Sequence, residues 1–222
     1  MNSHKLVTIC SIFLSIFIIG CASQNANKEN SEQLTENNSV GKNETVEHVI
    51  LNDSLRNALI ESGNKIARLT ALSLQRSLQS AIKEGGLIHA IKFCNIEAIP
   101  ITDSVSETET VNIRRLAKKY RNPLNETNAM ESELYKSYIL EWLGGHELKP
   151  KIITDGNGHP VYYNPIYVGA LCLNCHGEVG KNINEETAAT IQNLYPEDKA
   201  TNFKQGQLRG MWAITFTELK VK

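Results

Sequence analysis

Apolar residues recur at three- and four-residue steps along two consecutive stretches of the chain, and this spacing predicts helices. The first helix is expected from Asp53 to about Lys83. Gly85-Gly86 should end it and begin a second helix through Cys94, because glycine readily adopts the backbone that stops a helix. Pro100 follows so soon that we expect it near the end of this second helix rather than inside it.

The second half of the chain predicts both strands and helices. Apolar and polar residues alternate over 111–116, 151–154, 159–163 and 207–218, which is typical of strands. The last run would place Met211, Ala213 and Thr215 on one face and Trp212, Ile214 and Phe216 on the other. Between the second and third runs, Asp155-Gly156-Asn157-Gly158 is a strong hairpin signal.

Helical spacing returns between Thr127 and Leu143, where Gly144-Gly145 stops it, and again from Glu185 to Leu194. Helices therefore come first, and antiparallel strands with further helices follow. That order indicates the α+β class.

The N-terminus differs from the rest of the chain. After His4 and Lys5, the run Leu6–Ile19 is apolar but short for a bilayer span, and it ends at Gly20-Cys21. This is the layout of a secretory signal peptide, and the small residue before cysteine resembles a lipobox. Cys21 would then receive a diacylglycerol and become the new N-terminus. The alternative is a plain signal anchor with an incidental cysteine.

Residues 22–48 are rich in Asn, Glu, Ser and Lys and hold few apolar side chains, so they cannot bury enough surface to fold. We expect a flexible tether with a mean reach of roughly 30 Å. The predicted organisation is a signal peptide over 1–20, a lipidated tether over 21–48 and one folded domain over 49–222. The mature chain should be exported and lipid-anchored in a bacterium, facing the periplasm, at the outer rather than the inner membrane.

The charge balance excludes some partners. The chain has 23 Lys and Arg residues against 24 Asp and Glu residues. No basic excess exists to neutralise nucleic-acid phosphates or to hold a basic face on a membrane. No nucleophile–base pair or glycine-rich phosphate loop stands out, so we do not expect an enzyme.

The five cysteines divide by position. Cys10 lies in the signal peptide and Cys21 is the lipid site, whereas Cys172 and Cys175 belong to Cys172-Leu173-Asn174-Cys175-His176. In this CxxCH pattern two thiols form thioethers with the vinyl groups of haem, and the adjacent histidine binds the iron. A zinc site would need two more ligands in a second motif, and a redox CxxC has no need of the histidine. The motif therefore predicts one covalent haem c.

The ligand on the opposite face of the iron is left open by the motif. Candidates are Cys94, four histidines and two methionines, namely His48, His89, His146, His159, Met130 and Met211. Ile88, Ile91, Cys94 and Ala98 share one helical face, so Cys94 could equally be a small buried hydrophobe. Arg115 and Arg121 are candidates to pair with haem propionates, or else belong to a solvated stretch with Lys118 and Lys119.

Four segments together resemble a family of single-haem c domains with a PAS-like fold, long treated as a domain of unknown function. They are Ala90–Ala98, Arg121-Asn122-Pro123-Leu124-Asn125 with Glu131, Cys172–Gly177, and Tyr195–Ala200 running into Gly206 and Leu208-Arg209-Gly210. The family occurs as a stand-alone cyanobacterial haem protein and as the extracytoplasmic part of bacterial sensor kinases. The resemblance implies a PAS-like α+β fold, with Cys94 bound to the iron opposite His176.

A cysteine thiolate on the iron would fill its open face, which disfavours haem-enzyme chemistry. The family's sensor kinases favour redox or small-ligand sensing, with a gaseous molecule as the ligand. No HAMP-like segment or kinase follows Lys222, and this favours the alternative, electron transfer to a redox partner protein. The lipid bilayer, reached through Cys21, is the remaining expected partner.

Overall fold

The structure is a computed structural model and describes residues 49–222. The predicted signal peptide, the lipid site Cys21, the tether and His48 lie outside the described residues. The elements in chain order are α1 (Asp53–Glu109), β1 (Asn112–Leu116), the 3-10 turn η1 (Pro123–Asn125), α2 (Ala129–Leu143), β2 (Lys151–Thr154), β3 (Pro160–Tyr167), α3 (Leu173–His176), α4 (Glu185–Leu194) and β4 (Leu208–Thr215).

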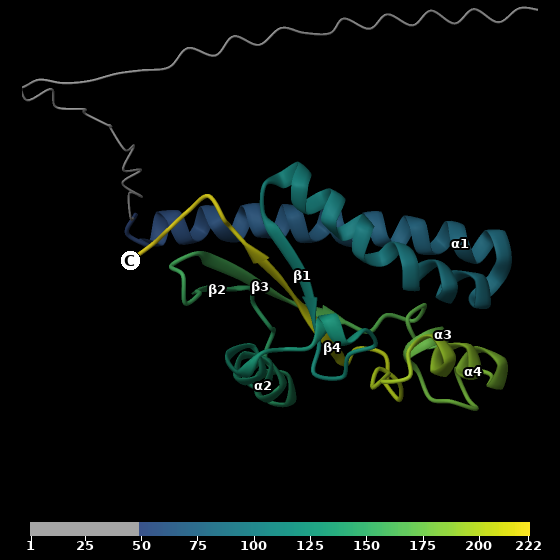
Figure 1. Cartoon of the computed structure of the whole chain (residues 1–222). Coiled ribbons are helices and arrows are strands. Elements are labelled where there is room, and N and C mark those ends of the chain that lie inside the picture. Colours follow the sequence, from purple (N-terminus) through teal and green to yellow (C-terminus); the bar gives the residue numbers. More distant parts are fainter. Residues whose placement is uncertain (1–48) are drawn as a thin grey trace, which may run out of the picture. The chain divides into compact units, whose positions relative to one another are not determined.

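Helix α1 is a helical hairpin (Figure 1). Asn52 caps its start, where the side-chain oxygen accepts a hydrogen bond from the Leu55 amide at 2.9 Å. The helical backbone breaks at Gly85 and at Gly86, whose φ of 71° suits glycine and few other residues. The expected break at Gly85-Gly86 is therefore confirmed, and it divides α1 into a first arm, 53–84, and a second arm, 87–109.

The second arm is longer than the sequence indicated, and the prediction for Pro100 is wrong. The arm continues to Glu109, so Pro100 lies in its interior. A proline there cannot donate to the carbonyl of Ile96, four residues earlier. Pro100 is exposed and Ile96 is 67% exposed, so this side of the helix faces water, which can hydrate the freed carbonyl. The helix therefore tolerates the missing hydrogen bond.

The strands form one antiparallel sheet in the order β1-β4-β3-β2. The predicted β2–β3 hairpin is confirmed, and in its turn the Asp155 carboxylate accepts hydrogen bonds from the amides of Asn157 and His159. Strand β4 is central and ends at Thr215, earlier than expected. Its predicted alternation is confirmed, since Met211 and Ala213 belong to one core cluster, and Trp212 and Ile214 to another.

The two cores lie on opposite faces of the sheet (Figure 1). On one face, α1 packs with Leu59, Ile66 and Val105 against Tyr162, Trp212 and Ile214. On the other, α2 packs with Leu134, Tyr135 and Tyr138 against Tyr163 and Met211. The fold is therefore α+β, as expected, with a long N-terminal helix over a four-stranded antiparallel sheet.

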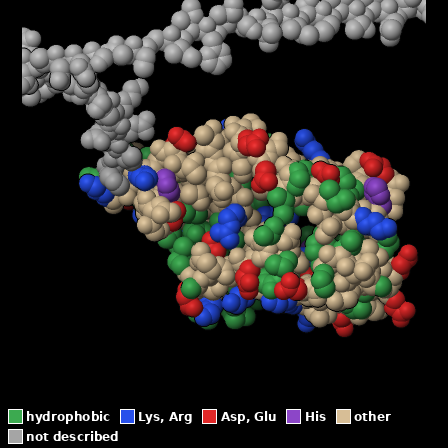
Figure 2. All heavy atoms as spheres, viewed as in Figure 1, with side chains coloured by type: hydrophobic (Ala, Val, Ile, Leu, Met, Phe, Trp, Pro, Cys, Tyr) green, Lys and Arg blue, Asp and Glu red, His purple; other side chains and the backbone are tan. Residues whose placement is uncertain are grey.

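Helices α3 and α4 lie beyond one end of the sheet (Figure 1). Ile183, Ile191 and Tyr195 join this region to Ile91 on the second arm of α1. On the face shown in Figure 2, acidic and basic side chains are interspersed. None of the helices within residues 49–222 combines the length and apolarity that a bilayer span requires.

Candidate functional site

The CxxCH segment forms one compact turn. Helix α3 spans only Leu173–His176, and the His176 amide donates to the Cys172 carbonyl at 2.8 Å. Both motif cysteines are free thiols and are half-buried. Residues three or four apart share a side of a helical turn, so this geometry groups Cys172, Cys175 and His176. Gly177 closes the turn, and a methyl group there would overlap the Leu173 carbonyl oxygen and the Asn182 side chain.

His176 is held by its Nδ1 atom. Nδ1 lies 2.7 Å from the carbonyl oxygen of Ala200. A carbonyl oxygen can only accept, so Nδ1 carries the proton and Nε2 keeps its lone pair. Burial, together with the charges of Arg209 and Arg121, holds the pKa of His176 well below its usual value. The ring is therefore neutral, with Nε2 free, which is the form that binds metals.

Phe203 supports the same ring from the side. Its ring centroid lies 6.4 Å from that of His176 in an edge-on arrangement, and its amide donates to the His176 carbonyl at 2.9 Å. The cations of Lys119 and Arg209 approach the Phe203 ring centroid at 4.6 and 5.3 Å. The imidazole is thus fixed both by a hydrogen bond and by an aromatic contact.

Cys94 lies on the second arm of α1, the arm that packs against the region of the CxxCH turn. Burial raises the pKa of its thiol, and the charges of Arg115 and Arg121 oppose that rise. The charges of Arg115 and Arg121 also lower the pKa of His176, and Cys94 acts electrostatically on Cys175. Ile91, one helical turn before Cys94, packs in one cluster with Cys175, so the structure brings Cys94 near the CxxCH turn although the two segments are far apart in sequence.

The other described candidates for an iron ligand lie elsewhere. His89 pairs with Glu84 on the surface at 3.7 Å, and His146 is exposed beyond the end of α2. His159 lies in the β2–β3 turn, with Nδ1 2.9 Å from the Leu219 carbonyl. Met211 is fully buried in the core under α2, and Met130 is exposed at the start of α2.

Arg115 faces the site without a partner. It follows Ile113 by two residues on β1, so both side chains point to the sheet face that α1 covers. Among the described residues, Arg115 makes no hydrogen bond or ion pair. Burial lowers the pKa of Arg115, whereas Cys94 and Tyr195 act to raise it. A half-buried guanidinium that has no hydrogen bond to the described residues is available for a negatively charged ligand group.

Arg209 is a site residue that the sequence reasoning did not single out. Burial and the charges of Arg121 and Arg115 lower its pKa to about 10. Its Nη1 donates to the Lys119 carbonyl at 2.9 Å. The sequence signal for Arg209 is the segment Leu208-Arg209-Gly210, which belongs to the family resemblance. Three guanidiniums therefore gather near Cys94 and His176.

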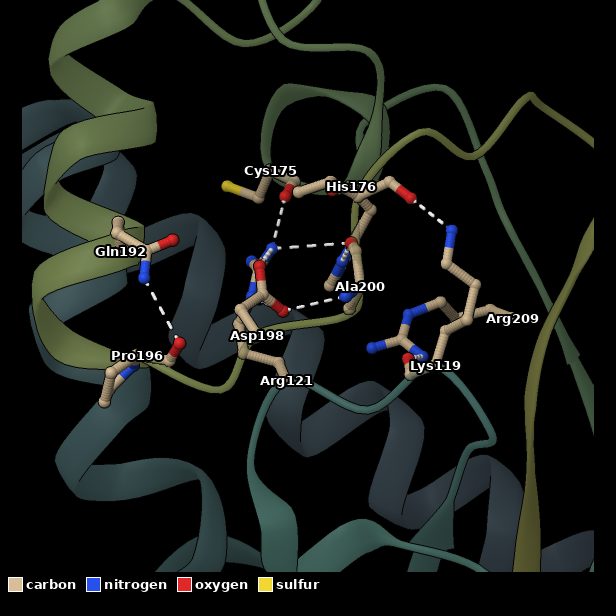
Figure 3. Close-up of polar contacts among 10 residues, drawn as sticks. Lys119, Arg121, Cys175, His176, Gln192, Pro196, Asp198, Ala200 and Arg209 are labelled. Atoms are coloured by element: carbon tan, nitrogen blue, oxygen red, sulfur yellow. Dashed lines mark hydrogen bonds and ion pairs between the residues drawn. The ribbon is translucent and has the colours of Figure 1, made fainter.

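Arg121 is already extensively bonded (Figure 3). Its Nε and Nη2 atoms bind the two carboxylate oxygens of Asp198 at 3.2 and 3.0 Å, and Nη2 also donates to the Cys175 carbonyl at 2.7 Å. The side chains are 13% and 4% exposed, respectively. Asp198 was likewise missed as an individual residue, although it lies in the segment Tyr195–Ala200.

The donor set fits a haem c. It offers two free thiols separated by two residues, a neutral imidazole with its Nε2 free, and a further thiol from another helix. Arg115 adds an unpaired cation suited to a haem carboxylate. Each chemical feature that covalent attachment and axial ligation require is therefore present in one cluster.

The fold and the site together define the class of this protein. It is an α+β domain in which a helical hairpin covers a four-stranded sheet and a CxxCH turn lies at one end of that sheet. A family model described as Tll0287-like matches residues 22–217, so the chain belongs to the Tll0287-like family, which confirms the resemblance.

A solved structure, the crystal structure of the cyanobacterial heme-protein Tll0287, is similar to this chain at 23% sequence identity. The match covers 72% of this chain and 98% of that one, with a TM-score of 0.48. No curated protein matches the chain.

Proposed function

We propose that the chain binds one haem c covalently through Cys172 and Cys175, with His176 bound to the iron through Nε2. The observation that carries the proposal is the His176 ring, whose Nδ1–H is fixed on the Ala200 carbonyl within the CxxCH turn. Membership of the Tll0287-like family supports it. When bound, haem supplies a one-electron Fe(III)/Fe(II) couple.

Cys94 is proposed as the ligand opposite His176. It is the cysteine of the described chain that lies outside the CxxCH motif, and the charges of Arg115 and Arg121 act on both Cys94 and His176. Burial raises the pKa of the Cys94 thiol, and the positive charges of Arg115 and Arg121 offset part of that rise; a bound metal would keep the sulfur deprotonated. A thiolate is the form of cysteine that binds metals.

Arginine side chains are proposed to hold the haem propionates. Arg115 is unpaired and faces the site, so its planar guanidinium is available for a carboxylate. Arg121 can offer only Nη1, since its other nitrogens already bind Asp198 and the Cys175 carbonyl. Arg209 adds a third positive charge, and its pKa responds to the other two.

The proposed role is redox or small-ligand sensing by a PAS-like domain. Cys94 and Val105 lie on the same arm of α1, and Val105 packs in the core between α1 and the sheet. Release of Cys94 from its ligand position would therefore act on an arm that is packed against the sheet. Cys94 would bind a reduced iron less strongly than an oxidised one, and its release would leave room for a small gaseous ligand.

Electron transfer to a partner protein is the alternative. Cys172 and Cys175 are only half-buried, so a group attached to them would have an edge near the surface. An accessible edge favours exchange of electrons with another protein. The expected lipid at Cys21 and the periplasmic location belong to either function and rest on residues outside the described part.

Optical and EPR spectra of the purified protein in both redox states, with a haem stain on a denaturing gel, test this function. We expect covalent haem in the wild type and none in the Cys172→Ala, Cys175→Ala double variant, both made with a c-haem maturation system. A low-spin ferric signal typical of thiolate ligation is expected. A wild-type protein that releases all its haem on denaturation would overturn the proposal.

A further inference from the structure

We propose that Asp198 is a positioning residue for His176, because it ties Arg121 and Ala200 into a closed ring of contacts around the CxxCH turn. The inference rests on the proposed function, since it assigns Asp198 a role toward the imidazole that would bind iron. In this proposal the main role of Arg121 is to link Asp198 to the Cys175 carbonyl rather than to bind a propionate.

The ring can be followed contact by contact in Figure 3. One carboxylate oxygen of Asp198 accepts from the Ala200 amide at 2.9 Å. The Ala200 carbonyl accepts from Nδ1 of His176 at 2.7 Å. Arg121 bridges back, because it binds Asp198 with two nitrogens and donates to the carbonyl of Cys175, the residue before His176.

Burial makes this ring stiff. The side chains of Arg121 and Asp198 are 13% and 4% exposed, so water competes little for their two parallel hydrogen bonds. A buried pair of this kind is weak evidence for stability, yet removing one partner leaves an uncompensated charge. The main effect of the arrangement is therefore geometric: it holds the Ala200 carbonyl at a fixed distance from the His176 ring.

The orientation of a metal-binding histidine affects its chemistry. Donation from Nδ1–H to a carbonyl makes Nε2 a better electron donor and fixes the ring's rotation. Loss of that hydrogen bond would weaken donation to the iron, stabilise Fe(III) less and raise the reduction potential. Asp198 does not touch the ring, so its effect passes through Ala200 and Arg121.

The chain supplies a matched control in Glu131. This carboxylate is also nearly fully buried, at 3% side-chain exposure, and pairs with an arginine, Arg114, at 2.8 Å. It too accepts a backbone hydrogen bond, from Asn128 at 2.8 Å. It lies at the start of α2 and contacts neither α3 nor His176 in any hydrogen bond. Glu131→Gln thus imitates the charge loss of Asp198→Asn without reaching the site.

The test compares full-length Asp198→Asn, Arg121→Lys and Glu131→Gln with the wild type, by thermal unfolding, hydrogen exchange and haem spectroscopy. In Asp198→Asn we expect amide exchange over residues 172–177 and at Ala200 to rise about tenfold or more. The ferric EPR signal should change and the reduction potential should rise. Arg121→Lys keeps the positive charge but loses the two parallel hydrogen bonds to Asp198. It should likewise raise amide exchange and the reduction potential and change the ferric EPR signal. Glu131→Gln should lose thermal stability and leave the site readouts unchanged.

Wild-type exchange and spectra in Asp198→Asn, or equal changes at the site in Glu131→Gln, would overturn the role of Asp198. Should Asp198→Asn fail to fold, Arg121→Lys decides the matter by the same readouts. A wild type without covalent haem would instead refute the proposed function. Hydrogen exchange would still report whether Asp198 holds the His176 ring, so the two failures are distinguishable.

Discussion

Tyr162 lies directly beneath Gly63, so closely that a methyl group on Gly63 would overlap the tyrosine ring. The Tyr162 hydroxyl donates to Oδ1 of Asn64, the next residue along α1, at 2.6 Å. The ring is fully buried, so the pair sets how closely the first arm approaches the sheet. This approach needs glycine because it leaves no space for a Cβ atom.

Gly63→Ala should therefore destabilise the fold by about 1–3 kcal/mol, the usual cost of forcing an extra carbon into a packed core. Urea unfolding of the purified protein measures it. Gly156→Ala is the control, because that glycine has open space around it and should change the free energy of unfolding little. Equal stability of Gly63→Ala and wild type would contradict the close approach.

Cys94→Ser should convert a low-spin ferric haem into a high-spin or water-bound one and raise the reduction potential, because a thiolate donates more charge to Fe(III) than an alcohol does. Covalent attachment should survive, since the thioethers are elsewhere. Optical and EPR spectra provide the measurement. The matched variants Met130→Leu and His159→Gln should keep the wild-type spectrum. An unchanged low-spin ferric spectrum in Cys94→Ser would assign the ligand to another residue.

Arg115→Gln should lower the reduction potential of the haem. A nearby positive charge favours the added electron, and this charge is half-buried and makes no ion pair among the described residues, so solvent and counter-charges screen it only in part. Potentiometric titration followed optically gives the shift. Lys149→Gln removes one positive charge from an exposed position and should leave the potential close to that of wild type. A rise in potential, or an equal shift in both variants, would argue against Arg115 near the haem.

Cys21→Ser should release the protein from membranes, because one acylated cysteine supplies the proposed anchor and the polar segment after it offers no apolar face. Membrane fractionation provides the test. Mass spectrometry of the N-terminus must accompany it, since an uncleaved apolar segment would also retain the protein. A wild-type N-terminus without lipid mass would contradict the prediction.

Local patterns were enough for much of the fold. The β2–β3 hairpin follows from its Asp-Gly-Asn-Gly turn, and the boundaries of α4 follow from helical spacing, since both features are written in adjacent residues. Pro100 was misjudged because the cost of a proline in a helix depends on which side of the helix faces water. That exposure is set by tertiary packing and cannot be read from neighbouring residues.

The candidate site also contains parts that the local sequence predicts and parts that it does not. The CxxCH motif is local, and its chemistry can be read from five consecutive residues. Asp198 and Arg209 act on the site only because the fold brings the segments after β1 and α4 and the start of β4 next to α3. Arg121 and Asp198 are 77 positions apart in the sequence, so no local pattern could show that they meet.

The two ends of the described chain meet far from the CxxCH turn. Val49 pairs with Val221, and its amide donates to the Lys220 carbonyl at 2.9 Å. This junction lies at the end of the sheet and of α1 away from α3 and α4 (Figure 1). A protein anchored through the residues before Val49 would therefore carry its attachment point and its proposed haem at opposite ends of the described domain. A soluble partner could then reach the end that bears the proposed haem without contact with the attachment point.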